Sequence, residues 1–131
     1  MVFTTSDGTK ELAEPICRPV RYGKRPVRGL NPWETQDARL LETVNRGEFT
    51  INGSRNRDLR NHLYDRPTED IREQRRRSAV ITRKLRQLRA HGLIRKVPKT
   101  HRYVLTESGR EIITSLMAAR CATAEMLMKA A

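Results

Sequence analysis

The stretch from Asp70 to Leu105 constrains this chain most, because it combines a long basic helix with a short basic hairpin. At 100° per residue, side chains within about 60° of Leu85 form one mostly apolar stripe, which predicts a face turned to a core. The members of this stripe are Ile71, Gln74, Ser78, Ile81 and Leu88. The opposite, outward face carries Arg72, Arg76, Ala79 and Arg83, with Arg75 and Arg86 beside it.

The end of this helix and the hairpin after it are marked by glycine and by turn chemistry. His91-Gly92 predicts the helix end, because glycine adopts the left-handed backbone conformation without penalty. Two β-rich runs at 93–97 and 102–105 are joined by a four-residue turn, which predicts a hairpin. An arginine-rich helix beside a basic hairpin is the expected form of a protein that reads the major groove of DNA.

The charge of the chain is concentrated in the same region. The net charge is +12 over 131 residues, and residues 51–102 alone carry sixteen basic and five acidic side chains. Charge confined to one segment implies a polyanionic partner, since self-repulsion otherwise costs stability. DNA, RNA and an anionic membrane all meet this condition. The membrane is disfavoured, because the chain lacks both a run of roughly 20 apolar residues and a Trp/Phe-rich amphipathic face.

The remaining segments predict further short elements. An apolar pattern before Gly47 predicts a first helix, Glu48 to Ile51 a short strand, and Ser54 the cap of a second helix over 55–64. A final helix is expected from 106–109 towards 131. Its later part carries more apolar surface than a small domain needs, so we expect it to form a homodimer contact or to pack on its own domain.

Residues 1–30 form a basic arm that we expect to be irregular, because glycines and prolines interrupt any periodicity. Its cations could lie along DNA phosphates or in a minor groove. The alternative is a flexible tail or the remnant of a longer protein. The cations are Arg18, Arg21, Lys24, Arg25 and Arg28. The domain organisation expected is therefore an arm over 1–30 and a domain with a C-terminal helix over 31–131.

The run from Ser78 to Glu111 resembles the recognition-helix and wing segment of winged helix-turn-helix proteins of the MarR-like and related bacterial types. The residues that carry the resemblance are Ser78, Ile81, Thr82, Arg83, Leu85, Leu88, Gly92, Leu93, Ile94, Leu105, Thr106 and Gly109. The resemblance implies a mainly α fold with a small β-hairpin wing. It covers 31–117 by the order of the elements, but only 78–111 by motif.

The resemblance also implies roles for individual side chains in binding DNA. Arg76, Ser78, Ala79, Thr82, Arg83 and Arg86 would face base edges or groove walls, with Arg72 and Arg75 on the same helix. Arg55, Asn56 and Arg57, at the start of the second helix, would meet phosphates. Lys96, Lys99, Thr100, His101 and Arg102 would form the wing and contact phosphate or the minor groove.

Catalytic, metal and cofactor sites are not indicated by the sequence. His62, His91 and His101 are each isolated, and Cys17 and Cys121 lack metal-ligand spacing, which favours free thiols in a reducing cytoplasm. No paired acids, nucleophile–base pair or glycine-rich phosphate loop is present, so we expect no enzyme activity. The first ten residues lack the apolar core of a signal peptide, and a cytoplasmic location is expected.

Three hypotheses of function follow. The leading one is sequence-specific binding of double-stranded DNA, by a transcriptional regulator or by an accessory protein of a mobile element or plasmid. The second is a winged-helix interaction module of a larger assembly, whose basic face binds RNA or an acidic protein surface. A third, an effector-sensing repressor, needs a pocket beside a dimerising helix, and the low aromatic content argues against it.

Overall fold

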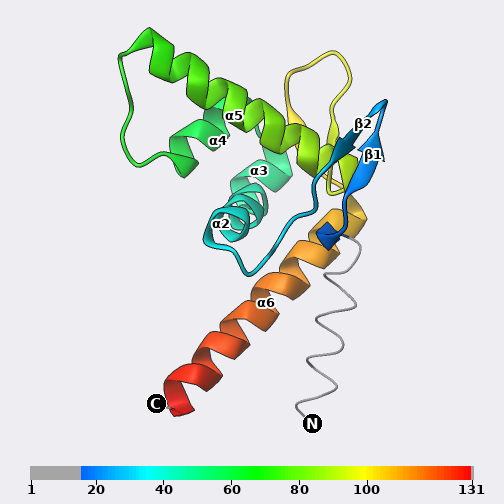
Figure 1. Cartoon of the computed structure of the whole chain (residues 1–131), viewed down its shortest axis with the longest axis vertical. Helices are drawn as coiled ribbons and strands as arrows, with labels where there is room; N and C mark the ends of the chain where they lie inside the picture. Colours follow the sequence, from blue (N-terminus) through cyan, green and yellow to red (C-terminus); the bar gives the residue numbers. More distant parts are fainter. Residues whose placement is uncertain (1–15, 131) are drawn as a thin grey trace.

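The computed structural model describes residues 16–130, and these form a mainly helical domain with two small antiparallel hairpins (Figure 1). The helices are α2 (Thr35–Val44), α3 (Gly47–Asn52), α4 (Asn56–Leu63), α5 (Ile71–Ala90) and α6 (Glu107–Ala130). The strands are β1 (Val20–Tyr22), β2 (Arg25–Val27), β3 (Ile94–Lys96) and β4 (Tyr103–Leu105). The order α2, α4, α5, β3, β4 is that of a winged helix-turn-helix domain, as the sequence predicted.

Helix α5 has an aspartate cap at its start and ends at the glycine that the sequence predicts. The Asp70 carboxylate caps the first turn by accepting a hydrogen bond from the backbone N–H of Arg72 at 3.0 Å. Gly92 follows the last turn with φ of 72°, which a side chain would strain. The apolar stripe is buried only in the second half of the helix. Ile71 is 63% exposed, contrary to the prediction, because the first turns of α5 extend beyond the other helices (Figure 1).

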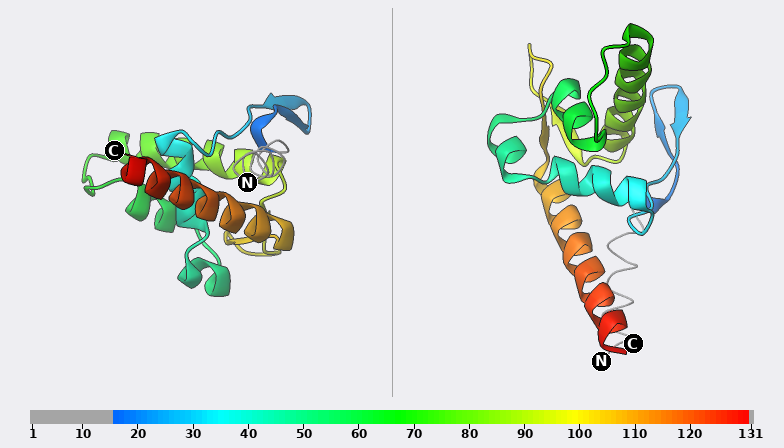
Figure 2. Two further views of the ribbon diagram at one scale, coloured as in Figure 1. Left: turned by 90° about the horizontal axis from the view of Figure 1, so that it is seen from below. Right: turned by 90° about the vertical axis from the view of Figure 1, so that its left-hand side faces the viewer.

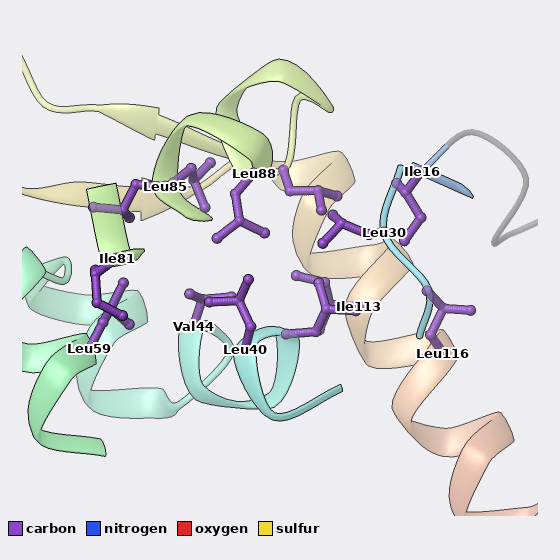
Figure 3. Close-up of a cluster of buried hydrophobic side chains, with 13 residues drawn as sticks. Ile16, Leu30, Leu40, Val44, Leu59, Ile81, Leu85, Leu88, Ile113 and Leu116 are labelled. Atoms are coloured by element: carbon purple, nitrogen blue, oxygen red, sulfur yellow. The ribbon is translucent and has the colours of Figure 1, made fainter. Parts of the chain in front are cut away.

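The hydrophobic core lies between α2, α4, α5 and α6 (Figure 3). It is built from aliphatic side chains that are almost fully buried, which is consistent with the low aromatic content of the chain. These are Leu40, Leu41 and Val44 from α2, Leu59 from α4, Ile81, Leu85 and Leu88 from α5, Ile113 and Leu116 from α6, Leu93 and Ile94 at the start of the wing, and Ile16 and Leu30.

The β3–β4 hairpin is the predicted wing. Its register pairs Ile94 with Leu105 and Lys96 with Tyr103. Ser54 joins it as a single-residue third strand, because the backbone groups of Ser54 and Tyr103 exchange two hydrogen bonds of 2.8 Å. Backbone hydrogen bonds therefore connect the wing to the segment immediately before α4.

The segment expected to be a strand, Glu48 to Ile51, is instead part of helix α3, so that prediction was wrong. In a strand, residues 49 and 51 would share one face. Phe49 is 8% exposed whereas Ile51 is 81% exposed, because only the helix face that carries Phe49 meets the domain. Ser54 was also expected to cap α4, but its backbone pairs with the wing and Arg55 occupies the N-cap position.

Residues 20–27 form the β1–β2 hairpin, so the irregular conformation expected for this part of the arm was wrong, whereas residues 1–15 of the arm lie outside the described residues. The ends of the hairpin segment are held in the core, since Ile16 and Leu30 are buried and the N–H of Leu30 donates to the Ile16 carbonyl. Asp37 of α2 fixes the exit of the hairpin, because its fully buried carboxylate accepts from the Asn31 N–H at 2.9 Å and from Arg28 at 3.4 Å.

The first turns of α6 complete the core, and the rest of the helix extends away from the domain (Figure 1). Met126, Leu127 and Met128 are more than half exposed in its distal part. Within residues 16–130, no helix is long and apolar enough to cross a membrane.

Gly109 provides a test of the packing between α6 and the wing. A Cβ at this position would collide with the backbone carbonyl of Leu93, so we expect Gly109→Ala to destabilise the fold by about 1–3 kcal/mol. Gly47→Ala is the matched control: nothing lies within 4 Å of its Cβ position, and a change between zero and about 1 kcal/mol of stabilisation is expected. Urea denaturation of both variants measures the difference, and equal unfolding free energies would contradict this packing.

Candidate nucleic-acid interface

The outward face of α5 presents cationic side chains to solvent. Arg72, Arg75 and Arg83 are exposed, and among the described residues their guanidinium groups have no hydrogen-bond or ion-pair partner. Ala79 is exposed between them, as expected. The small side chain of Ala79 allows another molecule to approach the helix backbone closely.

Arg76 lies on the same face, but its guanidinium forms an ion pair with the carboxylate of Glu73. Glu73 accepts two hydrogen bonds from Arg76, at 2.7 and 2.9 Å, and one from Arg77 at 3.0 Å. These bonds hold the pKa of the Glu73 carboxyl at about 2. Arg77 also lies over the Tyr64 ring and donates to the Arg66 carbonyl, so it fastens the start of α5 to the preceding loop.

A groove, which we call the basic groove, lies beside this face and is formed by α4, α5, the wing and the β1–β2 hairpin. Five arginines line it, and none of its described lining residues is an acid, so its potential is strongly positive. The lining residues are Tyr22, Arg55, Asn56, Arg57, Arg60, Ser78, Thr82, Leu85, Arg86, Arg89, His101 and Tyr103.

The start of α4 is fixed to α5 by Asn56. The Asn56 Nδ2 donates to the Ser78 carbonyl at 3.0 Å and to Thr82 Oγ1 at 3.1 Å, and the Thr82 hydroxyl donates to the same carbonyl. Asn56, Ser78 and Thr82 thus join two helices, in addition to lining the groove. Arg55 and Arg57 remain exposed at the entrance, where the amide groups of a helix N-terminus favour an anion.

The wing residues divide between exposed cations and turn-forming groups. Lys96, Lys99 and His101 are exposed, and Lys99 takes a positive φ of 64° within the turn. Thr100 closes that turn by donating its hydroxyl proton to the Val97 carbonyl at 2.8 Å. Arg102 reaches back to the Asn52 carbonyl at 3.3 Å and so connects the wing to the end of α3.

Arg86, expected to face DNA, contacts the β1–β2 hairpin. It donates to the Tyr22 carbonyl at 3.0 Å, and its guanidinium carbon lies 5.2 Å from the centre of the Tyr22 ring. Arg89 lies between two aromatic rings, 5.7 Å from Tyr22 and 5.8 Å from Tyr103. The two hairpins therefore meet around Arg89.

Four groove residues were missed by the sequence analysis: Tyr22, Arg60, Arg89 and Tyr103. Tyr22-Gly23 between two β-rich runs was an available turn signal. Arg89 could have been placed from the helical angle, since it lies only about 40° from Leu85 and therefore at the edge of the buried stripe. Tyr22 joins the groove through its contacts with Arg86 and Arg89, which lie more than sixty residues further along the chain.

No group of three or more potential metal ligands exists among residues 16–130. Cys17 and Cys121 are free and exposed, and partial burial raises the pKa of the Cys17 thiol. Two histidines contact other elements of the domain: His62 lies 3.6 Å from Glu48 and packs edge-on against Phe49, while His91 Nε2 lies 2.9 Å from the Arg28 carbonyl.

The hydrogen bonds from Arg76 and Arg77 to Glu73 predict how the Glu73 carboxyl titrates. Its folded pKa of about 2 lies below the ordinary 4.5, so ionised Glu73 stabilises the fold above about pH 4.5, and this contribution is lost as the pH falls through 2. We expect Arg76→Ala to raise the pKa of Glu73 in a carboxyl-carbon NMR titration. Arg72→Ala removes the same charge from α5 without removing a bond to Glu73. An equal rise in the Glu73 pKa in both variants would contradict a specific effect of the hydrogen bonds from Arg76.

Seven of the expected residues line the basic groove, and the exposed arginines of α5 lie on the helix that forms one of its walls. The seven are Arg55, Asn56, Arg57, Ser78, Thr82, Arg86 and His101. The wing cations Lys96 and Lys99 lie on the adjacent hairpin. Comparison of the chain with protein-family models, with curated protein sequences and with solved structures finds no match.

Proposed function

We propose that this protein binds double-stranded DNA in a sequence-dependent manner, with α5 as the recognition helix and β3–β4 as the wing. The observation that carries the proposal is the joining of two cationic surfaces. One is formed by Arg72, Arg75 and Arg83 of α5, which have no partner among the described residues, and the other is the basic groove, whose described lining contains no acid. Glu73 pairs with Arg76 and Arg77, but the exposed Arg72, Arg75 and Arg83 and the described lining of the groove have no such acid, and this concentration of charge is suited to a row of phosphates.

The shape of α5 supports duplex DNA over other polyanions. The major groove of B-DNA is about 12 Å wide and admits a helix, whereas that of A-form RNA is too deep and narrow for side chains to read. The first turns of α5 extend beyond the body of the domain, so a long exposed helix surface is available (Figure 1). Arg83 can reach the O6 and N7 of guanine, and Ala79 can contact a thymine methyl group.

The surrounding elements fit contacts with the DNA backbone. Arg55 and Arg57 stand at the N-terminus of α4, and Lys99 stands at the tip of the wing, all exposed. In this proposal they position the duplex, whereas α5 distinguishes its sequence. A role in transcriptional regulation, or in the function of a mobile element or plasmid, would use this binding activity.

The central experiment is a binding selection. The full chain is titrated against random duplex DNA, a single strand and an RNA hairpin at two salt concentrations, and the retained duplexes are sequenced. We expect preferential retention of duplexes that share a motif, and a steep salt dependence. A palindromic motif would indicate a dimer on DNA. Equal binding to all three polymers without enrichment of a motif would overturn sequence-specific recognition and favour an RNA or protein partner.

Two single variants separate base reading from backbone contact. We expect Arg83→Ala to lower affinity for the selected duplex by roughly 1–3 kcal/mol and to relax discrimination between sequences. Lys99→Ala, on the wing, should weaken binding to all sequences alike and reduce the salt slope by about 1. The measurement is the ratio of affinities for selected and scrambled duplexes. Equal, sequence-independent losses in both variants would contradict the role of Arg83.

A further inference from the structure

The β1–β2 hairpin is attached to the recognition helix by several independent contacts. Arg86 donates a hydrogen bond to the backbone carbonyl of Tyr22, and the guanidinium groups of Arg86 and Arg89 lie over the Tyr22 ring. At the base of the hairpin, Gln87 Nε2 donates to the carbonyls of Arg28 and Gly29, at 3.3 and 3.1 Å. The hairpin therefore has a fixed position beside α5.

Its charge is of one sign. Residues 16–30 contain five cations and no acid, and Arg21, Lys24 and Arg25 are exposed at and around the turn. In the register, Arg25 pairs with Tyr22 and Arg21 pairs with Pro26, so the two arginines lie on opposite faces of the hairpin. Lys24 lies in the turn itself.

This cationic hairpin is held next to other cations, which is electrostatically unfavourable for the protein alone. Arg86 and Arg89 of α5 pack on Tyr22, and stacking on an aromatic ring leaves their charge in place. Asp37 of α2 pairs with Arg28 at the base of the hairpin, but neither the groove lining nor the described hairpin segment contributes a further carboxylate that would offset this repulsion. A bound polyanion would offset it.

The β1–β2 hairpin and the wing occupy comparable positions on the two sides of helices α4 and α5. The view on the right of Figure 2 shows them rising on opposite sides of α4 and α5, with their turns towards the same end of the molecule. Figure 1 shows that the distal part of α6 extends towards the other end. Tyr22 and Tyr103, one from each hairpin, both line the basic groove and both contact Arg89.

We propose that the β1–β2 hairpin is a second wing, which binds the DNA backbone on the side of α5 opposite to β3–β4. This inference rests on the proposed DNA binding and adds to it a partner surface outside the recognition helix and the first wing. Arg21, Lys24 and Arg25 contact phosphates that flank the sequence read by α5. The duplex is then held at two flanks, and α5 lies between them.

The test uses the full chain, a duplex that carries its selected motif, and the triple variant Arg21→Ala/Lys24→Ala/Arg25→Ala. Each lost phosphate contact lowers the salt slope by about 0.9, so we expect the slope to fall by about 2 to 3 and affinity to fall roughly tenfold or more. Hydroxyl-radical footprinting should lose protection at one flank only, and the selected motif should remain unchanged.

The matched control is Arg39→Ala/Arg110→Ala/Arg120→Ala, which removes the same charge from α2 and α6. We expect this control to keep the wild-type footprint and salt slope. The variant Arg21→Lys/Arg25→Lys retains the hairpin charge and should bind nearly as the wild type does. Thermal unfolding, followed by circular dichroism, verifies that the alanine variant keeps the wild-type midpoint.

The outcomes separate this inference from the proposed function. If the wild type selects a motif but the hairpin and control triples have the same footprint and slope, the second wing is overturned and DNA binding stands. If the lysine variant binds as weakly as the alanine triple, the proposed contacts of the hairpin cations with phosphates are also overturned. If the wild type shows no preference for duplex DNA, both proposals fail.

Discussion

The burial of Ile81, Leu85 and Leu88 fixes the rotation of α5 about its axis, and the arrangement of the charged end of the molecule depends on that rotation. Because successive side chains are 100° apart, burial of this stripe sends Arg83 outward and directs Arg86 and Arg89 to one side. The same rotation presents the Ser78 carbonyl to Asn56 of α4. Burial of this one apolar stripe therefore determines which side chains of α5 face solvent, the groove and the β1–β2 hairpin.

The parts of the fold that the sequence predicted correctly are those governed by local rules. Helix α5 has a 3.6-residue pattern and a glycine after its last turn, and the wing has two β-rich runs with a short turn. Where the local rule needed a tertiary partner, the prediction was wrong. Ile71 fits the apolar stripe by angle but is exposed, since no element among residues 16–130 covers the first turn of α5.

The rest of the site depends on contacts that local patterns do not contain. Proline at 19 and 26 argued against regular structure, yet an isolated two-stranded hairpin tolerates proline, and this hairpin is fixed by Gln87 and Arg86 from far along the chain. In α3, the β-forming residues Phe49 and Ile51 favoured a strand, but burial of one aromatic ring against the domain prevailed over propensity. The basic groove could be predicted only in part, because the position of Tyr22 in its wall depends on such contacts.

The arginines of α5 have two physical roles that the count of positive charges does not separate. Arg77, Arg86 and Arg89 are held by rings or carbonyls of the protein itself and thereby fix the loop and the two hairpins around the helix. Arg72, Arg75 and Arg83 have no such partner within the described residues. Packing on a ring or carbonyl leaves the guanidinium charged, so the structural arginines still add to the field that the free ones present. The positions of the hairpins and the positive charge of the groove thus have a common source, and a change to a structural arginine such as Arg86 alters both.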